Sequence, residues 1–152
     1  MSYIGSILEP GEQVRYHTTV SWTIYIPAIL FAIIAAAFLS LGVTSPEWVN
    51  LGWIGAAAFG LIAFVAYVRA WFRRWTTEIA VTDRRIIFKR GLIRRHTVEM
   101  NMQKVESVDV DQTLIGRLFN YGNVTIRGVG STFETLRMID APLKLRTTVT
   151  AG

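Results

Sequence analysis

Basic side chains clustered around two predicted turns are the residues of this sequence best suited to binding a ligand. They form one pair and one set of four: Arg84 and Arg85, then Lys89, Arg90, Arg94 and Arg95. A basic side chain held near an anionic bilayer gains about 1 kcal/mol, an effect that falls off over the Debye length. The cluster therefore predicts contacts with anionic lipid headgroups. The alternative is that these residues are solvated ends of strands and turns that also set the membrane topology.

No pattern in the sequence predicts catalysis. The sequence has two histidines, His17 and His96, no cysteine, and no HExxH, GxSxG or Walker A pattern. Neither a metal cage nor an activated nucleophile can be assembled from this set. Asp109 and Asp111 are two apart and fit one solvated face of a strand, and residues 128–131 lack the lysine and following helix of a phosphate loop. We expect no catalytic residue, no metal and no cofactor, and hence no enzyme.

Two uncharged stretches precede the basic part of the chain, at residues 22–43 and 48–68. With a rise of 1.5 Å per residue, the first spans about 33 Å, against about 30 Å for a hydrocarbon core. We therefore expect a transmembrane helical hairpin within residues 21–72, between an N-terminal cytoplasmic segment at 1–20 and a cytoplasmic domain at 73–152. A cleaved signal peptide is the alternative, which the length of the first stretch and the acidic residues before it disfavour.

The distribution of charge predicts how the hairpin is oriented. From Arg69 onward the chain has 15 Lys and Arg against 8 Asp and Glu, whereas the loop between the spans has only Glu47. The positive-inside rule then places both termini in the cytoplasm, for a multi-pass protein of the inner (plasma) membrane. The residues expected to anchor the hairpin at the membrane interface are Trp22, Arg69, Trp71, Arg73, Arg74 and Trp75.

Small residues recur at every fourth position of both apolar stretches. They are Ala28, Ala32, Ala36 and Ser40 in the first and Gly52, Ala56 and Gly60 in the second. Such stripes let helix backbones approach closely, either within the hairpin or between copies of the chain. No charged residue lies at mid-membrane, so we expect an anchor and not a transport pathway.

After Arg74 the pattern alternates with a period of two, which is typical of half-buried strands. We expect a first strand from Trp75 to Thr82, then further strands up to Ile139, with interruptions at residues 101–104 and 113–120. Six or seven short strands predict a small antiparallel barrel or sandwich. Pro142 predicts the start of a short C-terminal helix, although the threonines that follow are poor helix formers.

Several motifs, in order, resemble bacterial pleckstrin-homology-like domains of the YdbS-like membrane proteins. They are residues 78–87 (EIAVTDRRII), 89–93 (KRGLI), 103–108 (QKVESV), Gln112 and 116–124 (GRLFNYGNV). The resemblance covers about residues 74–140, together with the preceding pair of spans. It implies a mainly β pleckstrin-homology-like barrel closed by a C-terminal helix, and the short, threonine-rich end of this chain departs from that pattern.

These observations together predict a membrane-anchored, non-enzymatic interaction or scaffold module that self-associates. One alternative is binding of anionic lipid headgroups at the cytoplasmic leaflet, and another is an accessory subunit of a membrane complex. The expected partners are the lipid bilayer, further copies of the chain and other membrane proteins. We expect no nucleic-acid binding, because topology explains the charge and no exposed aromatic platform is evident.

Overall fold

The computed structural model describes residues 8–91, 96–130 and 133–151 of the chain. It divides into two compact units: a helical unit, Ile24–Phe72, and a β domain that combines Met1–Thr23 with Arg73–Gly152. The helical unit is thus inserted into the sequence of the β domain. The chain leaves the β domain near Thr23 and re-enters it near Arg73.

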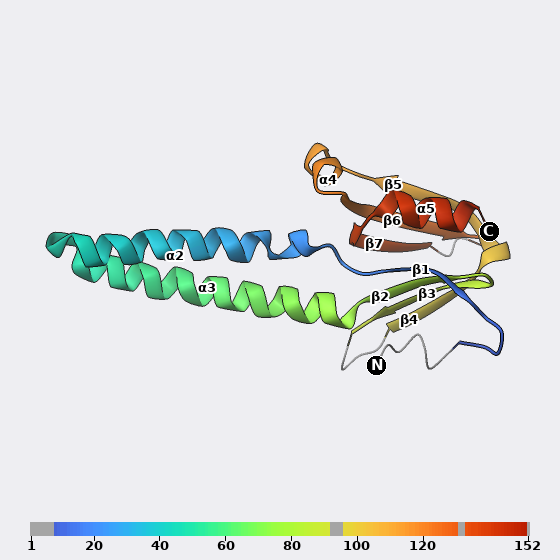
Figure 1. Cartoon of the computed structure of the whole chain (residues 1–152), viewed down its shortest axis with the longest axis horizontal. Coiled ribbons are helices and arrows are strands. Elements are labelled where there is room, and N and C mark those ends of the chain that lie inside the picture. The colour runs from blue at the N-terminus through green and yellow to red at the C-terminus, as the bar shows by residue number, and fades with distance from the viewer. Residues whose placement is uncertain (1–7, 92–95, 131–132, 152) are drawn as a thin grey trace. The chain divides into compact units, whose positions relative to one another are not determined.

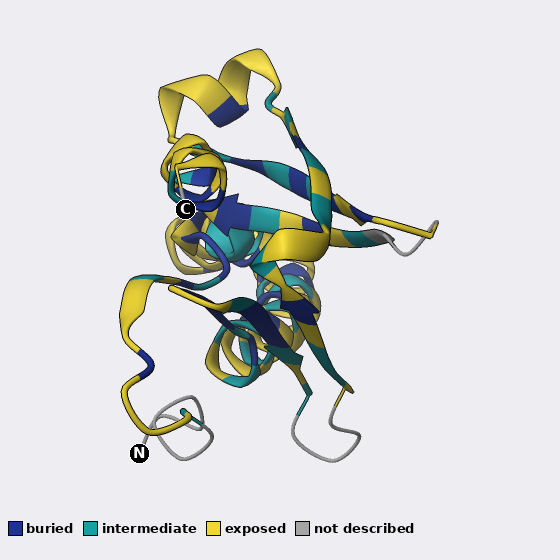
Figure 2. Cartoon of the chain, turned by 90° about the vertical axis from the view of Figure 1, so that its right-hand side faces the viewer, coloured by how far each residue is buried: buried dark blue, intermediate teal, exposed yellow. Residues whose placement is uncertain are grey.

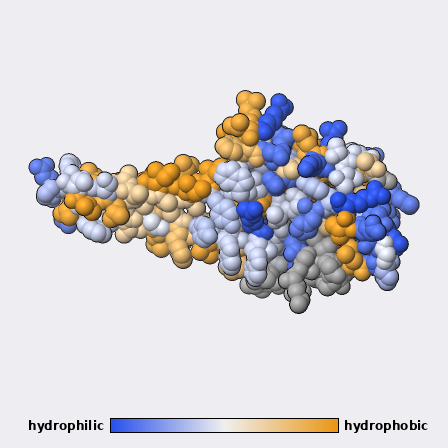
Figure 3. Space-filling view, viewed as in Figure 1, coloured by the Kyte–Doolittle hydropathy of each residue, from blue (hydrophilic) through white to orange (hydrophobic). Residues whose placement is uncertain are grey.

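The helical unit is a hairpin of two long helices, α2 (Ile26–Thr44) and α3 (Val49–Thr76), each entered through a short 3-10 turn, η1 (Trp22–Tyr25) and η2 (Pro46–Trp48). Apolar residues run along both helices (Figure 3). Within Trp22–Thr44 and Pro46–Thr76, an 18-residue window reaches a mean hydropathy of 2.5 and 2.0, respectively, so both helices are long and apolar enough to cross a membrane. The two predicted helices are present, but α3 continues to Thr76, through the residues expected to begin the first strand.

Glycines bring the two helices together near the tip of the hairpin. A Cβ added to Gly52 would overlap the backbone of Gly42, and one added to Gly55 would overlap the ring of Phe38. The ring of Phe38 also stacks on that of Phe59, with centroids 5.4 Å apart. The hairpin therefore depends on contacts that only glycine allows at these positions.

The predicted small-residue stripes are only partly used in this hairpin. Ala28 and Gly52 are buried, Ala56 and Gly60 are half-buried, and Ala32, Ala36 and Ser40 are exposed along α2. Gly42 and Gly55, which the stripes did not include, lie at the close contacts instead. Packing of the remaining stripe against another copy stays a prediction.

The β domain consists of two antiparallel sheets (Figure 1). The first has the order β1 (Val14–Thr18), β2 (Glu78–Thr82), β3 (Arg85–Arg90), β4 (His96–Asn101). The second has the order β5 (Val105–Asp111), β6 (Tyr121–Gly128), β7 (Phe133–Asp140). The interruptions expected between strands are the 3-10 turn η3 (Met102–Lys104) and the short helix α4 (Leu114–Leu118).

The strands do not form the closed barrel that the resemblance implied. An isolated bridge between Val20 and Ile139 connects the two sheets on one side, and the η3 corner connects β4 to β5 on the other. The C-terminal helix α5 (Pro142–Thr150) packs on β5, β6, β1 and β2, where Leu145 and Val149 are buried. Buried residues on the strands and on α5 form one core (Figure 2).

Helix α5 forms despite its threonines. The hydroxyls of Thr147, Thr148 and Thr150 donate to the carbonyls of Leu143, Lys144 and Arg146, at 3.1, 2.9 and 3.0 Å. Such bonds satisfy the hydroxyls within the helix, and the burial of Leu145 and Val149 against the sheets stabilises it. The short C-terminal helix expected from Pro142 is therefore present.

Strand β1 was not predicted, because it lies before the first apolar stretch and has no alternating apolar pattern. It pairs with β2 in antiparallel register, with Tyr16 opposite Val81, His17 opposite Ala80 and Thr18 opposite Ile79. The N-terminal segment therefore completes the first sheet.

A buried ion pair fixes this segment. The Glu12 carboxylate, whose side chain is fully buried, accepts hydrogen bonds from Arg85 Nη2 at 2.8 Å and from Thr82 Oγ1 at 2.7 Å. Burial raises the pKa of Glu12, but the bonds from Arg85, the Glu9 N–H and Thr82 outweigh it and lower the pKa from 4.5 to about 2. A carboxylate held this way stabilises the folded domain.

We predict that Glu12→Gln lowers the free energy of unfolding of the domain by about 3 kcal/mol at neutral pH, because Arg85 loses its buried counterion. The matched control is Glu106→Gln, since Glu106 is exposed on β5. The stabilisation from Glu12 is complete above pH 4.5 and is lost as the pH falls toward 2, so the variant also lacks this part of the acid dependence. Chemical denaturation of the full chain in detergent measures both effects. Equal stability of wild type and Glu12→Gln at neutral pH would contradict the assignment.

We predict that Gly52→Val lowers the melting temperature of the full chain in detergent by several degrees, because its side chain would collide with Gly42 and with the Phe38 carbonyl. Gly60→Val is the control, since a Cβ there meets nothing within 4 Å. Intrinsic fluorescence reports the transition, because Trp48 and Trp53 lie near the tip. A larger fall in melting temperature for Gly60→Val than for Gly52→Val would contradict the close contact between Gly52 and Gly42.

Candidate functional site

One end of the β domain is defined by the two points where the chain departs for α2 and returns from α3. The Thr19 hydroxyl donates to the carbonyls of Thr77 and Arg74, at 2.8 and 3.2 Å. These bonds hold the departing and returning segments side by side. We call this part of the domain the helix-side end, comprising Thr19, Val20, Trp22, Arg73, Trp75 and Thr77.

Three arginines from different elements meet in a small cleft at the helix-side end. Arg73 comes from the last turn of α3, Arg90 from the end of β3 and Arg137 from β7. The rest of the lining consists of Val20, Thr77, Phe88, Thr135 and Ile139. The cleft therefore combines three cationic groups and two hydroxyls on an apolar base.

A bulge in β7 explains how Arg137 comes to face the cleft. The β6–β7 register shifts between Gly122 and Val124, which pair with Ile139 and Leu136. Met138 lies at this shift in the left-handed region, with φ of 58°, and its N–H donates to Asn123 Oδ1 at 3.1 Å. An extra residue re-aims the side chains around it. Leu136 and Ile139 are thus both buried, while Arg137 between them is exposed.

The described residues place no carboxylate beside the three arginines of this cleft. Among the described residues, no acidic side chain lies within 4.0 Å of the guanidinium of Arg73, Arg90 or Arg137. The three guanidinium groups carry like charges and line one cleft, so they repel one another. Bound anions would relieve this repulsion, and guanidinium groups match phosphate oxygens in geometry. The arrangement is thus suited to an anionic group of phosphate type.

The basic pair predicted at the first turn forms ion pairs within the domain, and its contact with lipid stays a prediction. Arg84 pairs with Glu9 at 3.2 Å, and Arg85 pairs with Glu12 at 2.8 Å and with Glu99 at 3.0 Å. Arg85 therefore ties the N-terminal segment to the first sheet. Its charge is already satisfied, so the structure gives no support to Arg85 as a lipid contact.

The other basic residues predicted to contact lipid are only partly brought together. Arg90 joins the cleft, and Lys89 beside it is half-buried on β3. Arg94 and Arg95 lie outside the described residues. The cleft is assembled from three elements, and contact of Lys89, Arg90, Arg94 and Arg95 with lipid stays a prediction.

The predicted interfacial anchors are mostly exposed. Arg69 and Trp71 are exposed on α3, and the Trp71 ring meets that of Phe72 edge to face, with centroids 5.3 Å apart. Arg74 is half-buried and Trp75 exposed at the end of the same helix. Trp22 is exposed at the helix-side end, where it contacts Phe119. These positions suit an interfacial role, which stays a prediction.

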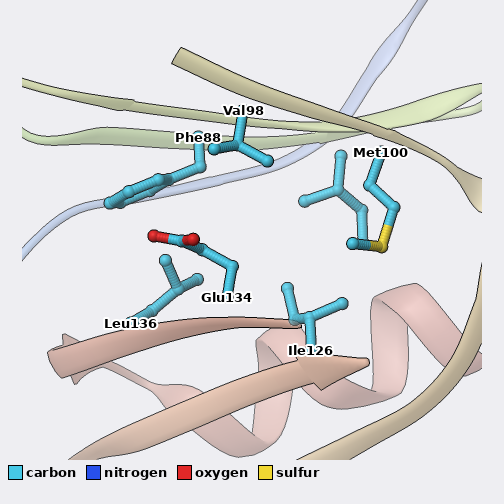
Figure 4. Close-up of a pocket in the computed structure, with 7 residues that line it drawn as sticks. Phe88, Val98, Met100, Ile126, Glu134 and Leu136 are labelled. Atoms are coloured by element: carbon cyan, nitrogen blue, oxygen red, sulfur yellow. The ribbon is translucent and has the colours of Figure 1, made fainter. Parts of the chain in front are cut away.

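A second, apolar cleft lies between the sheets (Figure 4). Phe88, Val98 and Met100 line it from the first sheet, and Ile126 and Leu136 from the second. The Glu134 side chain lies between the facing apolar groups, and it is the one ionisable residue in the lining (Figure 4). A single carboxylate without a partner acid, base or nucleophile supplies no catalytic arrangement. In the described part of the chain, no group of three or more potential metal-ligating side chains is found either.

A helix-capped pair of antiparallel sheets whose sequence is interrupted by two long apolar helices defines a small β domain with a helical insertion. The family model described as "Bacterial PH domain" matches residues 18–149. The chain therefore belongs to the bacterial PH domain family, which confirms the resemblance seen in its motifs. No curated protein matches it. Domains of this family are generally non-catalytic, and membership in the family suggests a module for protein interaction or lipid binding.

Sequence reasoning missed Arg137 and understated Arg73. Arg137 lies on the last strand, and the bulge at Met138 breaks the alternation that would assign its face. Arg73 was predicted only as an interfacial anchor, because nothing in the sequence indicates that it lies in the same cleft as Arg90. An arginine flanked by apolar residues, in Leu136-Arg137-Met138-Ile139, was the available signal.

Proposed function

We propose that this protein is a membrane-anchored, non-enzymatic interaction module whose PH domain binds anionic lipid headgroups beside its own anchor. In this proposal α2 and α3 span the membrane and both termini lie in the cytoplasm, as the excess of Lys and Arg after the hairpin favours. The observation that carries the proposal is the three-arginine cleft, which has no acidic partner among the described residues and lies where the chain enters and leaves the domain.

Chain connectivity supports a lipid headgroup as the ligand. Arg73 lies in the last turn of a helix that is apolar enough to cross a bilayer, so a spanning α3 brings its guanidinium to headgroup depth. Arg90 and Arg137 share the cleft with Arg73 and come to the same level. Three basic groups at about 1 kcal/mol each would give more than a tenfold preference for anionic over zwitterionic lipid.

We predict that replacing Arg73, Arg90 and Arg137 together with Gln removes most of the preference of the full chain for phosphatidylglycerol over phosphatidylcholine. Native mass spectrometry of the protein in detergent with each lipid measures this preference. The control replaces Lys104, Lys144 and Arg146 with Gln, which removes the same charge from exposed positions outside the cleft. An equal loss of this lipid preference in both triple variants would show a general charge effect and would contradict the cleft as the binding site.

Self-association through the hairpin is a second candidate. It is favoured by the line of Ala32, Ala36 and Ser40, which the hairpin leaves exposed along α2. In lipid, small residues of this kind let a second helix approach closely. The same protein would then act as a scaffold, with several PH domains on one membrane patch.

We predict that the full chain in nanodiscs has a mass above that of the monomer and that Ala36→Leu shifts it toward the monomer, because a larger side chain blocks close approach. Leu39→Ile, at an exposed neighbouring position, is the control. Mass photometry over a range of loading ratios measures the distribution. A strict monomer in the wild type would contradict self-association and would not affect the proposal of lipid binding.

A further inference from the structure

Helix α4 exposes its apolar residues and attaches to the domain through its backbone. Leu114 and Leu118 are 82% and 78% exposed, and Ile115 and Phe119 are exposed beside them. In Figure 3 apolar side chains gather at the place of α4, and in Figure 2 α4 is almost entirely exposed. This is the reverse of a surface helix, whose apolar residues normally face the core.

Hydrogen bonds and a close backbone contact hold α4 in this orientation. Thr113 caps its start by accepting the Gly116 N–H at 3.0 Å, and Gln112 Nε2 donates to the Tyr121 carbonyl at 3.1 Å. A Cβ on Gly116 would lie 2.6 Å from that carbonyl, so glycine lets the helix backbone sit directly on β6. Asn120 then ends the turn with φ of 53°, and its carbonyl accepts the Ala141 N–H at 2.9 Å. The apolar side chains are therefore held outward by a tightly bonded support.

The position of α4 in the β domain indicates what covers this face. The Phe119 ring meets the Trp22 ring edge to face, with centroids 5.7 Å apart and planes at 86°. Trp22 belongs to the helix-side end and begins Trp22–Thr44, a segment apolar enough to cross a membrane. A tryptophan at that point of a spanning segment lies at the headgroup level, and so must a ring in contact with it.

We propose that α4 is a membrane-inserting element, with Leu114, Ile115, Leu118 and Phe119 dipping into the acyl boundary of the bilayer. This inference rests on the proposed membrane anchorage and adds an apolar contact to it. Arg117, exposed on the same short helix, reaches lipid phosphates from its flank. The domain would then be fixed at two points, by charge at the arginine cleft and by insertion at α4, which sets its tilt on the membrane.

The test uses the full chain in phosphatidylcholine–phosphatidylglycerol vesicles with single introduced cysteines, since the native chain has none. Leu118→Cys carries an environment-sensitive fluorophore, and brominated lipids and aqueous iodide are the two quenchers. Leu143→Cys, an exposed leucine on α5, is the matched control. Ile34→Cys on α2 tests the anchorage itself.

We expect lipid quenching at 118 to exceed that at 143 at least threefold, and to fall by more than half when Leu114→Gln and Ile115→Gln are added. Quenching of 118 by iodide and not by brominated lipid overturns the proposal. Shielding of 118 from both quenchers, dependent on protein density, also overturns it and assigns the face to a second copy. Quenching by brominated lipid at 34 without quenching at 118 rejects insertion of α4 alone, whereas loss at both positions rejects the membrane anchorage.

Discussion

The pairing of β1 with β2 is the constraint on which the rest of this structure depends. It joins a segment before the hairpin to a strand after it, so the β domain cannot be completed until both helices have been made. The Glu12–Arg85 pair and the two hydrogen bonds of Thr19 secure the same junction from its two ends. The consequence is that the departing and returning chain segments are fixed together, which gives the domain a defined helix-side end.

That end brings together groups that are remote in sequence. Arg73 precedes β2, Arg90 ends β3 and Arg137 lies in the bulge of β7, yet all three line one cleft. Trp22 and Phe119 meet in the same domain, although 97 residues separate them in sequence. A cationic cleft and an apolar helix are complementary ways of holding a domain on a bilayer, since one contact is screened by salt and the other is not.

Strong local patterns were predictable from the sequence. The uncharged stretches gave both long helices, alternation gave the strands from β2 to β7 with shifted ends, and the ordered motifs gave the family, which the match to residues 18–149 confirms. Strand β1 was not predictable, because its polar composition does not favour a strand and only its pairing with β2 makes it one. The first predicted strand began too early, because Trp75 and Thr76 complete the last turn of α3 and also fit an alternating pattern. The pairing of Arg85 with Glu12, 73 residues away, was not predictable either, because no local pattern connects the two residues.

The most direct test of the account is the distance between arginine side chains and lipid phosphorus in the membrane. Solid-state NMR can measure it in bilayers containing phosphatidylglycerol, by dipolar recoupling of arginine ¹³Cζ with lipid ³¹P. We expect strong dephasing in the full chain that falls clearly when Arg73, Arg90 and Arg137 are replaced with Gln. Dephasing that is absent, or unchanged by these three substitutions, would contradict it.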